Sequence, residues 1–208
     1  MQTRPEHWNE VYEAREETAL TWFEAEPTLS LALIEACSGP GDAIIDIGGG
    51  ASRLVDALVA DGYRAVTVLD VSQAALRQSR NRLGLRADAV TWIEADIAQW
   101  RPENAYAVWH DRAVFHFLTE PADRAAYVAA MSAAVLPGGT AIIATFAEDG
   151  PERCSGLPVV RYAPADLAAT IEALAPGVFE PLEAQRHEHA TPKGARQMFQ
   201  VSVFRKSA

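Results

Sequence analysis

Short apolar runs alternate with stretches of helical periodicity along most of the chain. The apolar runs predict five strands, at 43–47, 65–69, 91–95, 106–110 and 140–146. Helical patterns lie between them, near 53–60, 73–83 and 122–135. Strands that alternate with helices favour a parallel sheet covered by helices on both faces, so we predict an α/β fold.

The pattern changes after residue 146. Residues 148–158 are rich in glycine and proline and predict a loop, and a helix is expected near 164–174. Two extended runs follow, at 179–187 and 197–205, with a short turn-like segment between them. They predict a terminal antiparallel β-hairpin. Because the sequence contains no internal repeat or linker, we expect one domain over residues 1–208.

The first predicted strand contains Asp46 and runs into a glycine turn, Gly48, Gly49 and Gly50. The second strand is followed by Asp70, twenty residues beyond Gly50. This spacing is typical of a nucleotide-type cofactor site. The glycines let the backbone approach the ligand, and the acid accepts hydrogen bonds from ribose hydroxyls. Asp46 would act through the turn or on an amino group of the cofactor; an acid that only caps the turn is the alternative.

Four further segments follow this turn in order. They are Asp70-Val71-Ser72, Ala95-Asp96-Ile97, Tyr106 to Asp111 and Leu136 to Thr140. Together with the glycine turn, they resemble the motifs of the class I S-adenosylmethionine (SAM)-dependent methyltransferases, over about residues 44–146. One position departs from that family, because Ser52 stands where a further glycine is common.

The resemblance implies a Rossmann-like, doubly wound, mostly parallel seven-stranded sheet that ends in an antiparallel hairpin. It also implies SAM as the cofactor. Asp70 and Val71 would then lie at the ribose, and Asp96 and Ile97 at the edge of the adenine. For Asp96, an acid that only caps a turn is again the alternative.

The N-terminal stretch resembles the lid of a smaller bacterial subset, which includes protein-lysine and thiopurine- or tellurite-type methyltransferases. The resemblance implies that Trp8, Tyr12 and Trp22 touch the cofactor. The alternative is that they only pack the first helix on the core, since Trp8 and Tyr12 share a helix face. The domain would then have three parts, a helical lid, a cofactor-binding core and an acceptor side, at residues 1–40, 41–146 and 147–208.

Three candidate catalytic residues, Asp111, Arg112 and His116, follow the fourth predicted strand. Ligands of open α/β sheets bind outside the carboxyl ends of the strands, so we expect these residues near the transferred methyl group. Asp111 is also a candidate cofactor contact. A histidine such as His116 could accept a proton near neutral pH. A packed histidine, or a structural ion pair between Asp111 and Arg112, is the alternative.

The segment from Cys154 to Tyr162 resembles one that recurs in a bacterial branch of the family. The resemblance places Cys154 and Tyr162 in an acceptor pocket. A small buried thiol is the alternative for Cys154. His187 and His189 share a strand face but lack a third ligand at suitable spacing, so we predict no metal site.

Charge and composition argue against nucleic-acid and membrane partners. The formal net charge is −10, which argues against a broad nucleic-acid surface. Arg77, Arg80, Arg82 and Arg86 gather on one predicted helix, and we interpret them as a solvated face. No run resembles a signal peptide or a membrane span, so we expect no membrane partner and a cytoplasmic protein.

We therefore predict a SAM-dependent methyltransferase with an unidentified acceptor, either a small molecule or a protein side chain. Two rivals remain. An NAD(P)-dependent oxidoreductase would need a third glycine where Arg53 stands, and a catalytic Tyr-x-x-x-Lys. A non-catalytic SAM-binding protein would show the same cofactor motifs.

Overall fold

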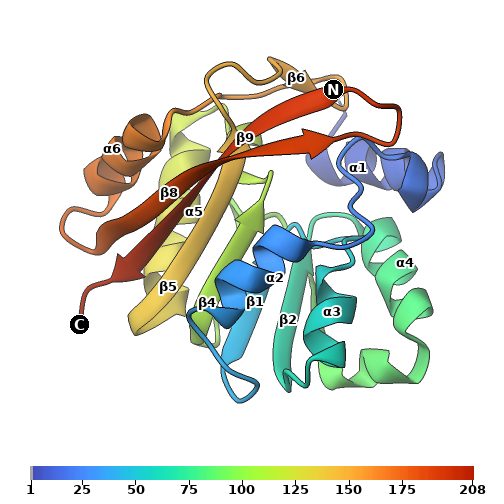
Figure 1. Cartoon of the computed structure of the whole chain (residues 1–208), viewed down its shortest axis with the longest axis horizontal. Helices are drawn as coiled ribbons and strands as arrows, with labels where there is room; N and C mark the ends of the chain where they lie inside the picture. The colour runs from blue at the N-terminus through green and yellow to red at the C-terminus, as the bar shows by residue number, and fades with distance from the viewer. Residues whose placement is uncertain (1) are drawn as a thin grey trace.

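The computed structural model describes residues 2–208 and is built around one seven-stranded sheet of order β3-β2-β1-β4-β5-β9-β8 (Figure 1). Its strands are β1 (Ala43–Ile47), β2 (Ala65–Asp70), β3 (Val90–Glu94), β4 (Tyr106–Arg112), β5 (Val135–Phe146), β8 (Phe179–Ala190) and β9 (Arg196–Lys206). The α-helices are α1 (Arg4–Glu13), α2 (Thr28–Glu35), α3 (Leu54–Ala60), α4 (Gln73–Leu83), α5 (Pro121–Ala134) and α6 (Pro164–Leu174).

The predicted sheet is confirmed. Strands β3, β2, β1, β4 and β5 run parallel, and β9 lies antiparallel between β5 and β8. The fifth strand begins earlier than predicted. Val135 already pairs with Tyr106, and the register then shifts before Val108 pairs with Thr140. Residues 136–139, which were predicted to precede the strand, therefore lie inside it at an irregularity.

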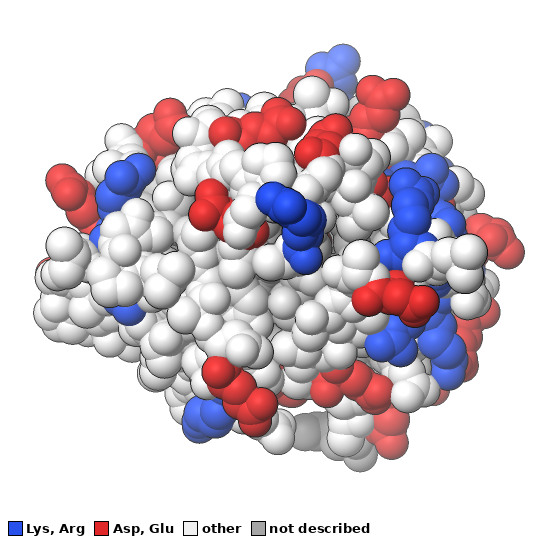
Figure 2. Space-filling model, turned by 90° about the horizontal axis from the view of Figure 1, so that it is seen from below, with Lys and Arg blue, Asp and Glu red and all other residues white. Residues whose placement is uncertain are grey.

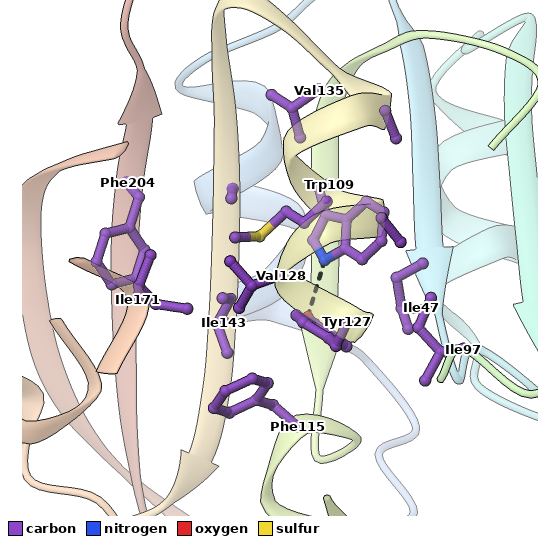
Figure 3. Packing of buried hydrophobic residues seen from close by; sticks show 14 of the residues in the cluster. Ile47, Ile97, Trp109, Phe115, Tyr127, Val128, Val135, Ile143, Ile171 and Phe204 are labelled. Carbon is purple, nitrogen blue, oxygen red and sulfur yellow. Dashed lines mark hydrogen bonds between the residues drawn. The ribbon is translucent and has the colours of Figure 1, made fainter. Parts of the chain in front are cut away.

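Each face of the sheet is covered by its own helices. On β1 and β4, Ile44 and Val108 face α2, α3 and α4, whereas Ile45 and Trp109 face α5 and α6. This alternation follows from the two-residue period of a strand. Figure 3 shows the second face, where the indole nitrogen of Trp109 donates a hydrogen bond of 2.8 Å to the hydroxyl of Tyr127. Both large rings are thereby buried with their polar atoms paired.

Sequence analysis missed a small hairpin inside the segment predicted to be a loop. It pairs β6 (Arg153–Cys154) with β7 (Leu157–Pro158). Its two turn residues, Ser155 and Gly156, have φ angles of 49° and 80°. Two consecutive positive φ angles are typical of a tight hairpin turn, and a Ser-Gly dipeptide is a signal for one. The hairpin matters because it holds Cys154 beside the end of β5.

Arginines of α4 are engaged by neighbours. Arg82 pairs with Glu17 and Asp56 at 2.6 Å each, Arg77 contacts Glu13, and Arg80 lies over the ring of Trp92. Figure 2 shows basic side chains gathered mainly on the side where Figure 1 places α4, with acidic side chains among them. Within residues 2–208, no helix combines the length and the apolar character needed to cross a bilayer.

Candidate active site

A cavity lies at the carboxyl ends of the parallel strands, beneath α1 and the segment that follows it. It contains about 860 Å³ of empty space, its open mouth included. The cavity is lined by residues from widely separated segments: Arg4, Trp8, Tyr12, Trp22, Ile47, Gly48, Leu69, Asp70, Val71, Ala95, Asp96, Ile97, Arg112, Ala113, Val114, Phe117, Leu118, Phe146, Cys154, Gln197 and Phe199.

The glycine turn needs glycine for steric reasons. Gly48 has a φ angle of 67°, and a Cβ there would lie 2.1 Å from Cγ2 of Val114. At Gly50, where φ is 34°, a Cβ would lie 2.6 Å from Oδ2 of Asp70. Any side chain at these positions would therefore displace the loop after β4 or the acid at the end of β2. Gly48 lines the cavity directly, whereas Gly49 and Gly50 are outside its lining.

Asp70 is the most deeply placed acid of the cavity, with 6% of its surface exposed. Its Oδ1 accepts a hydrogen bond of 2.7 Å from the backbone N–H of Ser72. Burial raises the pKa of Asp70 to about 7, and the nearby carboxylate of Asp46 adds to this rise. Among the described residues, 2–208, no cationic side chain forms an ion pair with this carboxylate, as expected for a group whose partner is a ligand.

Asp96 also lines the cavity, but Arg4 of α1 already contacts it. Arg4 Nη1 lies 3.2 Å from Asp96 Oδ2, and Arg4 Nη2 pairs with Asp123 at the start of α5. The backbone N–H of Ala98 donates to Asp96 Oδ1 at 2.9 Å. Sequence analysis did not find Arg4, because no local pattern reveals an ion pair between residues so far apart in the chain.

Predicted lid aromatics gather over the cavity. Trp8, Tyr12 and Trp22 line it together with Phe117, which sequence analysis did not single out. Ring centroids in this group are 5.1 Å apart for Trp8 and Phe117, 5.7 Å for Trp8 and Trp22, and 6.0 Å for Tyr12 and Trp22. The rings meet edge to face, which is a favourable aromatic geometry. They line the cavity and pack on one another at the same time.

Asp111 and His116 do not line the cavity. Asp111 follows the alternation of β4 and points to the α5 side, as Trp109 does. Its carboxylate accepts hydrogen bonds from the backbone N–H groups of Val114 (2.8 Å) and Phe115 (3.0 Å), and from the hydroxyl of Tyr127 (2.7 Å). Asp111 thus fixes the conformation of the loop after β4 through these hydrogen bonds. It makes no ion pair with Arg112.

His116 is fully buried against Phe117 and Phe146. Its Nδ1 accepts a hydrogen bond of 3.2 Å from the backbone N–H of Phe146, so the ring proton must sit on Nε2. Within residues 2–208, Nε2 has no hydrogen-bond partner. Burial lowers the pKa of His116 to about 3, and the charge of Arg112 adds to this effect. A neutral imidazole with its lone pair engaged cannot accept a proton, so this geometry does not support His116 as a general base.

Arg112 and Cys154 reach the cavity, and Tyr162 does not. Arg112 Nη2 lies 2.7 Å from Glu24 Oε1, and Nη1 donates to the carbonyl oxygen of Trp22 at 3.0 Å. Tyr162 packs in the α5-side core against Phe115, with ring centroids 5.6 Å apart. Of the five residues predicted to form the acceptor pocket, Arg112 and Cys154 line the cavity. Asp111, His116 and Tyr162 are buried in the core and do not line it.

Asp46 and His110 form a buried pair on the other side of the glycine turn. His110 Nδ1 lies 2.7 Å from Asp46 Oδ1, and His110 Nε2 lies 2.9 Å from the hydroxyl of Ser30 on α2. These residues line a smaller neighbouring cavity together with Gly49. Asp46 thus links the turn to α2 through His110. Sequence analysis singled out Asp46 but gave His110 no role, because its partner Ser30 comes from a distant helix.

Known proteins share this architecture and part of the sequence. A family model described as "Methyltransferase domain" matches residues 44–139. The chain is 25% identical over 108 residues to the eEF1A lysine and N-terminal methyltransferase of Mus musculus, a match that covers 51% of this chain and 15% of that protein. The chain therefore corresponds to only a small part of that relative.

Two solved structures show the fold. One is the 1,6-didemethyltoxoflavin-N1-methyltransferase of Burkholderia thailandensis, with a TM-score of 0.69, 22% identity and coverage of 87% of this chain and 78% of that one. The other is the N-methyltransferase NodS of Bradyrhizobium japonicum, with a TM-score of 0.71, 16% identity and coverage of 96% and 98%. Both structures contain S-adenosylhomocysteine.

The fold, the ordered motifs and the family model agree with one another. Residues 44–139 match a methyltransferase domain, and the chain shares its fold with solved methyltransferase structures.

Proposed function

We propose that this protein transfers the methyl group of SAM to an acceptor that enters the β4–β5 end of the cavity. The observation that carries the proposal is the order of lining residues along the sheet edge. Asp96 and Gly48 follow β3 and β1, Asp70 ends β2, and Arg112 and Phe146 end β4 and β5. One cavity therefore extends from a nucleoside-type site at the ends of β3, β2 and β1 to an apolar site at the ends of β4 and β5.

The residues present fit this cofactor. Asp70 would accept from the ribose hydroxyls, Asp96 would accept from the adenine amino group, and the backbone at Gly48 would contact the amino-acid part. SAM supplies a methyl group that its sulfonium charge already activates. The remaining task of the chain is to hold donor and acceptor in line and to exclude water. The rings of Trp8, Tyr12 and Trp22, which line the cavity, support the second role.

Calorimetry tests the cofactor assignment directly. We expect SAM and S-adenosylhomocysteine to bind and NAD to show no binding, because Arg53 replaces the third glycine of the dinucleotide turn. Transfer of a radiolabelled methyl group to deproteinised metabolites or to intact proteins of a cell extract then separates an enzyme from a binding protein. Binding without transfer to either fraction would favour the non-catalytic alternative.

We further predict that the lid becomes more ordered when SAM binds. Helix α1 is held at its edges by polar contacts, such as Asn9 Oδ1, which accepts from Ser72 Oγ at 2.9 Å and from Ala74 N at 3.0 Å. Its aromatic side chains face the cavity, so a ligand there adds contacts that the free protein lacks. Hydrogen exchange of residues 4–13 should slow with SAM. Helix α6, which is remote from the cavity, serves as the internal control, and equal protection of α1 in both states would favour a purely structural helix.

A further inference from the structure

The acceptor end of the cavity is formed by the ends of β4, β5 and β9 together with the β6–β7 hairpin. Phe146 pairs with Phe199 across β5 and β9, and both line the cavity. Phe117, Cys154 and Gln197 complete this end. Three phenyl rings with one amide and one thiol make a surface suited to a flat apolar molecule.

Arg112 brings positive charge to this apolar end. Its guanidinium carbon lies 5.3 Å from the ring centroid of Phe199. The contacts within residues 2–208 engage both terminal nitrogens, with Trp22, Glu24 and His189, and none engages the Nε–H. A guanidinium with one unengaged N–H, even when paired with Glu24, favours a ligand that offers it an acceptor atom, such as an anion, over a cationic ligand.

Proton acceptors are missing from this end within the described part of the chain. The lone pair of His116 is taken by the backbone of Phe146. Burial raises the pKa of Cys154 to about 12 and also raises the pKa of Tyr12, so both remain protonated and cannot take up a proton. Asp70 lies at the opposite end, where β2 ends.

The carboxylate of Glu24 contacts Arg112 from outside the lining of this end, and it also contacts two histidines. It lies 2.7 Å from Arg112, 3.4 Å from His189 and 3.8 Å from His187. Burial alone would raise the pKa of Glu24, but the hydrogen bond with His189 and the charge of Arg112 lower it overall. A carboxylate with a lowered pKa is a weak base at neutral pH.

We propose that the acceptor is a small planar aromatic molecule whose nucleophilic atom is already an anion in neutral water, and that it binds against Phe146 and Phe199 beside Arg112. An aromatic thiolate, an acidic phenolate or a deprotonated ring nitrogen has this character. The acceptor's lone pair forms the bond to the methyl carbon, the carbon–sulfur bond breaks, and its electron pair returns to sulfur. The sulfonium becomes a neutral thioether, the acceptor loses its negative charge, and no proton moves to the protein.

The same features disfavour a lysine acceptor. A lysine side chain arrives as an ammonium, so it must lose a proton before it can attack. Its charge would also lie beside Arg112. This proposal rests on the proposed function, because it concerns the second substrate of that reaction.

The test uses ring-substituted thiophenols and phenols of graded acidity, with n-butylamine and a lysine peptide as cationic probes, and radiolabelled SAM at saturation. For each anionic probe, kcat/KM should rise with pH and level off above the pKa of that probe. The midpoint should therefore move along the series with the probe. A midpoint common to all probes would show a base on the enzyme and overturn the proposal, as would preferred transfer to the amine or the peptide.

Two variants sharpen the test. Phe199→Leu should raise KM for the aromatic probes about 2- to 13-fold, which corresponds to the loss of one aromatic contact. Leu182→Ala, at an exposed position on β8, is the matched control and should leave KM unchanged. Failure of SAM to bind would reject the proposed function itself. SAM binding without transfer to any thiophenol or phenol would reject only the acceptor class.

Discussion

Replacing Asp111 by alanine should lower the free energy of unfolding by about 3–5 kcal/mol. The change leaves three donors without their acceptor: the backbone N–H groups of Val114 and Phe115, and the hydroxyl of Tyr127. Phe115 and Tyr127 lie in the buried layer between the sheet and α5, where water does not replace the lost bonds, and Val114 is partly buried against the same layer. Urea unfolding followed by circular dichroism measures the loss.

Two further variants calibrate this result. Asp111→Asn keeps one acceptor oxygen and should cost less than alanine. Tyr127→Phe removes a single hydrogen bond to Asp111 and should cost about 1–2 kcal/mol. If Asp111→Ala instead kept its stability and lost methyl transfer per folded molecule, Asp111 would be a catalytic residue, as the position after the fourth strand first indicated.

Replacing Asp70 by alanine should weaken SAM binding by about 1–3 kcal/mol, or roughly 5- to 150-fold, because the ribose hydroxyls lose their acceptor. The fold should tolerate the change better than at Asp111. Within residues 2–208, the side chain of Asp70 receives one hydrogen bond, from Ser72. Calorimetry gives the affinity. Unchanged affinity in a folded variant would contradict the proposal that the end of the cavity at Asp70 binds the nucleoside.

The same carboxylate should make SAM binding depend on pH. Burial raises the pKa of Asp70 to about 7, so the free protein is partly protonated there at neutral pH. Ribose hydroxyls donate to the ionised form, so binding releases this proton below pH 7, and affinity should fall by up to about tenfold per pH unit as pH decreases. Asp70→Asn removes the titrating group and should abolish this slope. Calorimetry in buffers of different ionisation enthalpy reports the proton release.

Much of the cofactor end was predictable from local sequence. The glycine turn, Asp70 and Asp96 follow directly after apolar strands, and parallel strands bring their carboxyl ends to one edge. Gly48 and Gly50 stand out in the local sequence, although the contacts that require glycine there, with Val114 and Asp70, come from the neighbouring loop and strand. Ser72 similarly caps α4 by accepting from Ala75 N.

The acceptor end depended on tertiary structure. Whether His116 faces a ligand or the core is decided by the hydrogen bond that Phe146 donates from β5, which no spacing around His116 reveals. The direction of Asp111 depends on the face of β4 that meets Tyr127 of α5. Arg4, Gln197 and Phe199 enter the cavity from the two ends of the chain.

Sequence alone therefore determined the class of fold, the order of the motifs and the acids at the strand ends. These features arise from backbone periodicity and from contacts within one strand–turn–helix unit. Tertiary structure alone decided which polar side chains face the cavity and which are buried with hydrogen-bond partners in the core. Those outcomes depend on partners many residues away in the chain, such as Arg4 with Asp96 and Arg112 with Glu24. Hydrophobic periodicity carries no information about such pairs, because it records burial and not the identity of the neighbour.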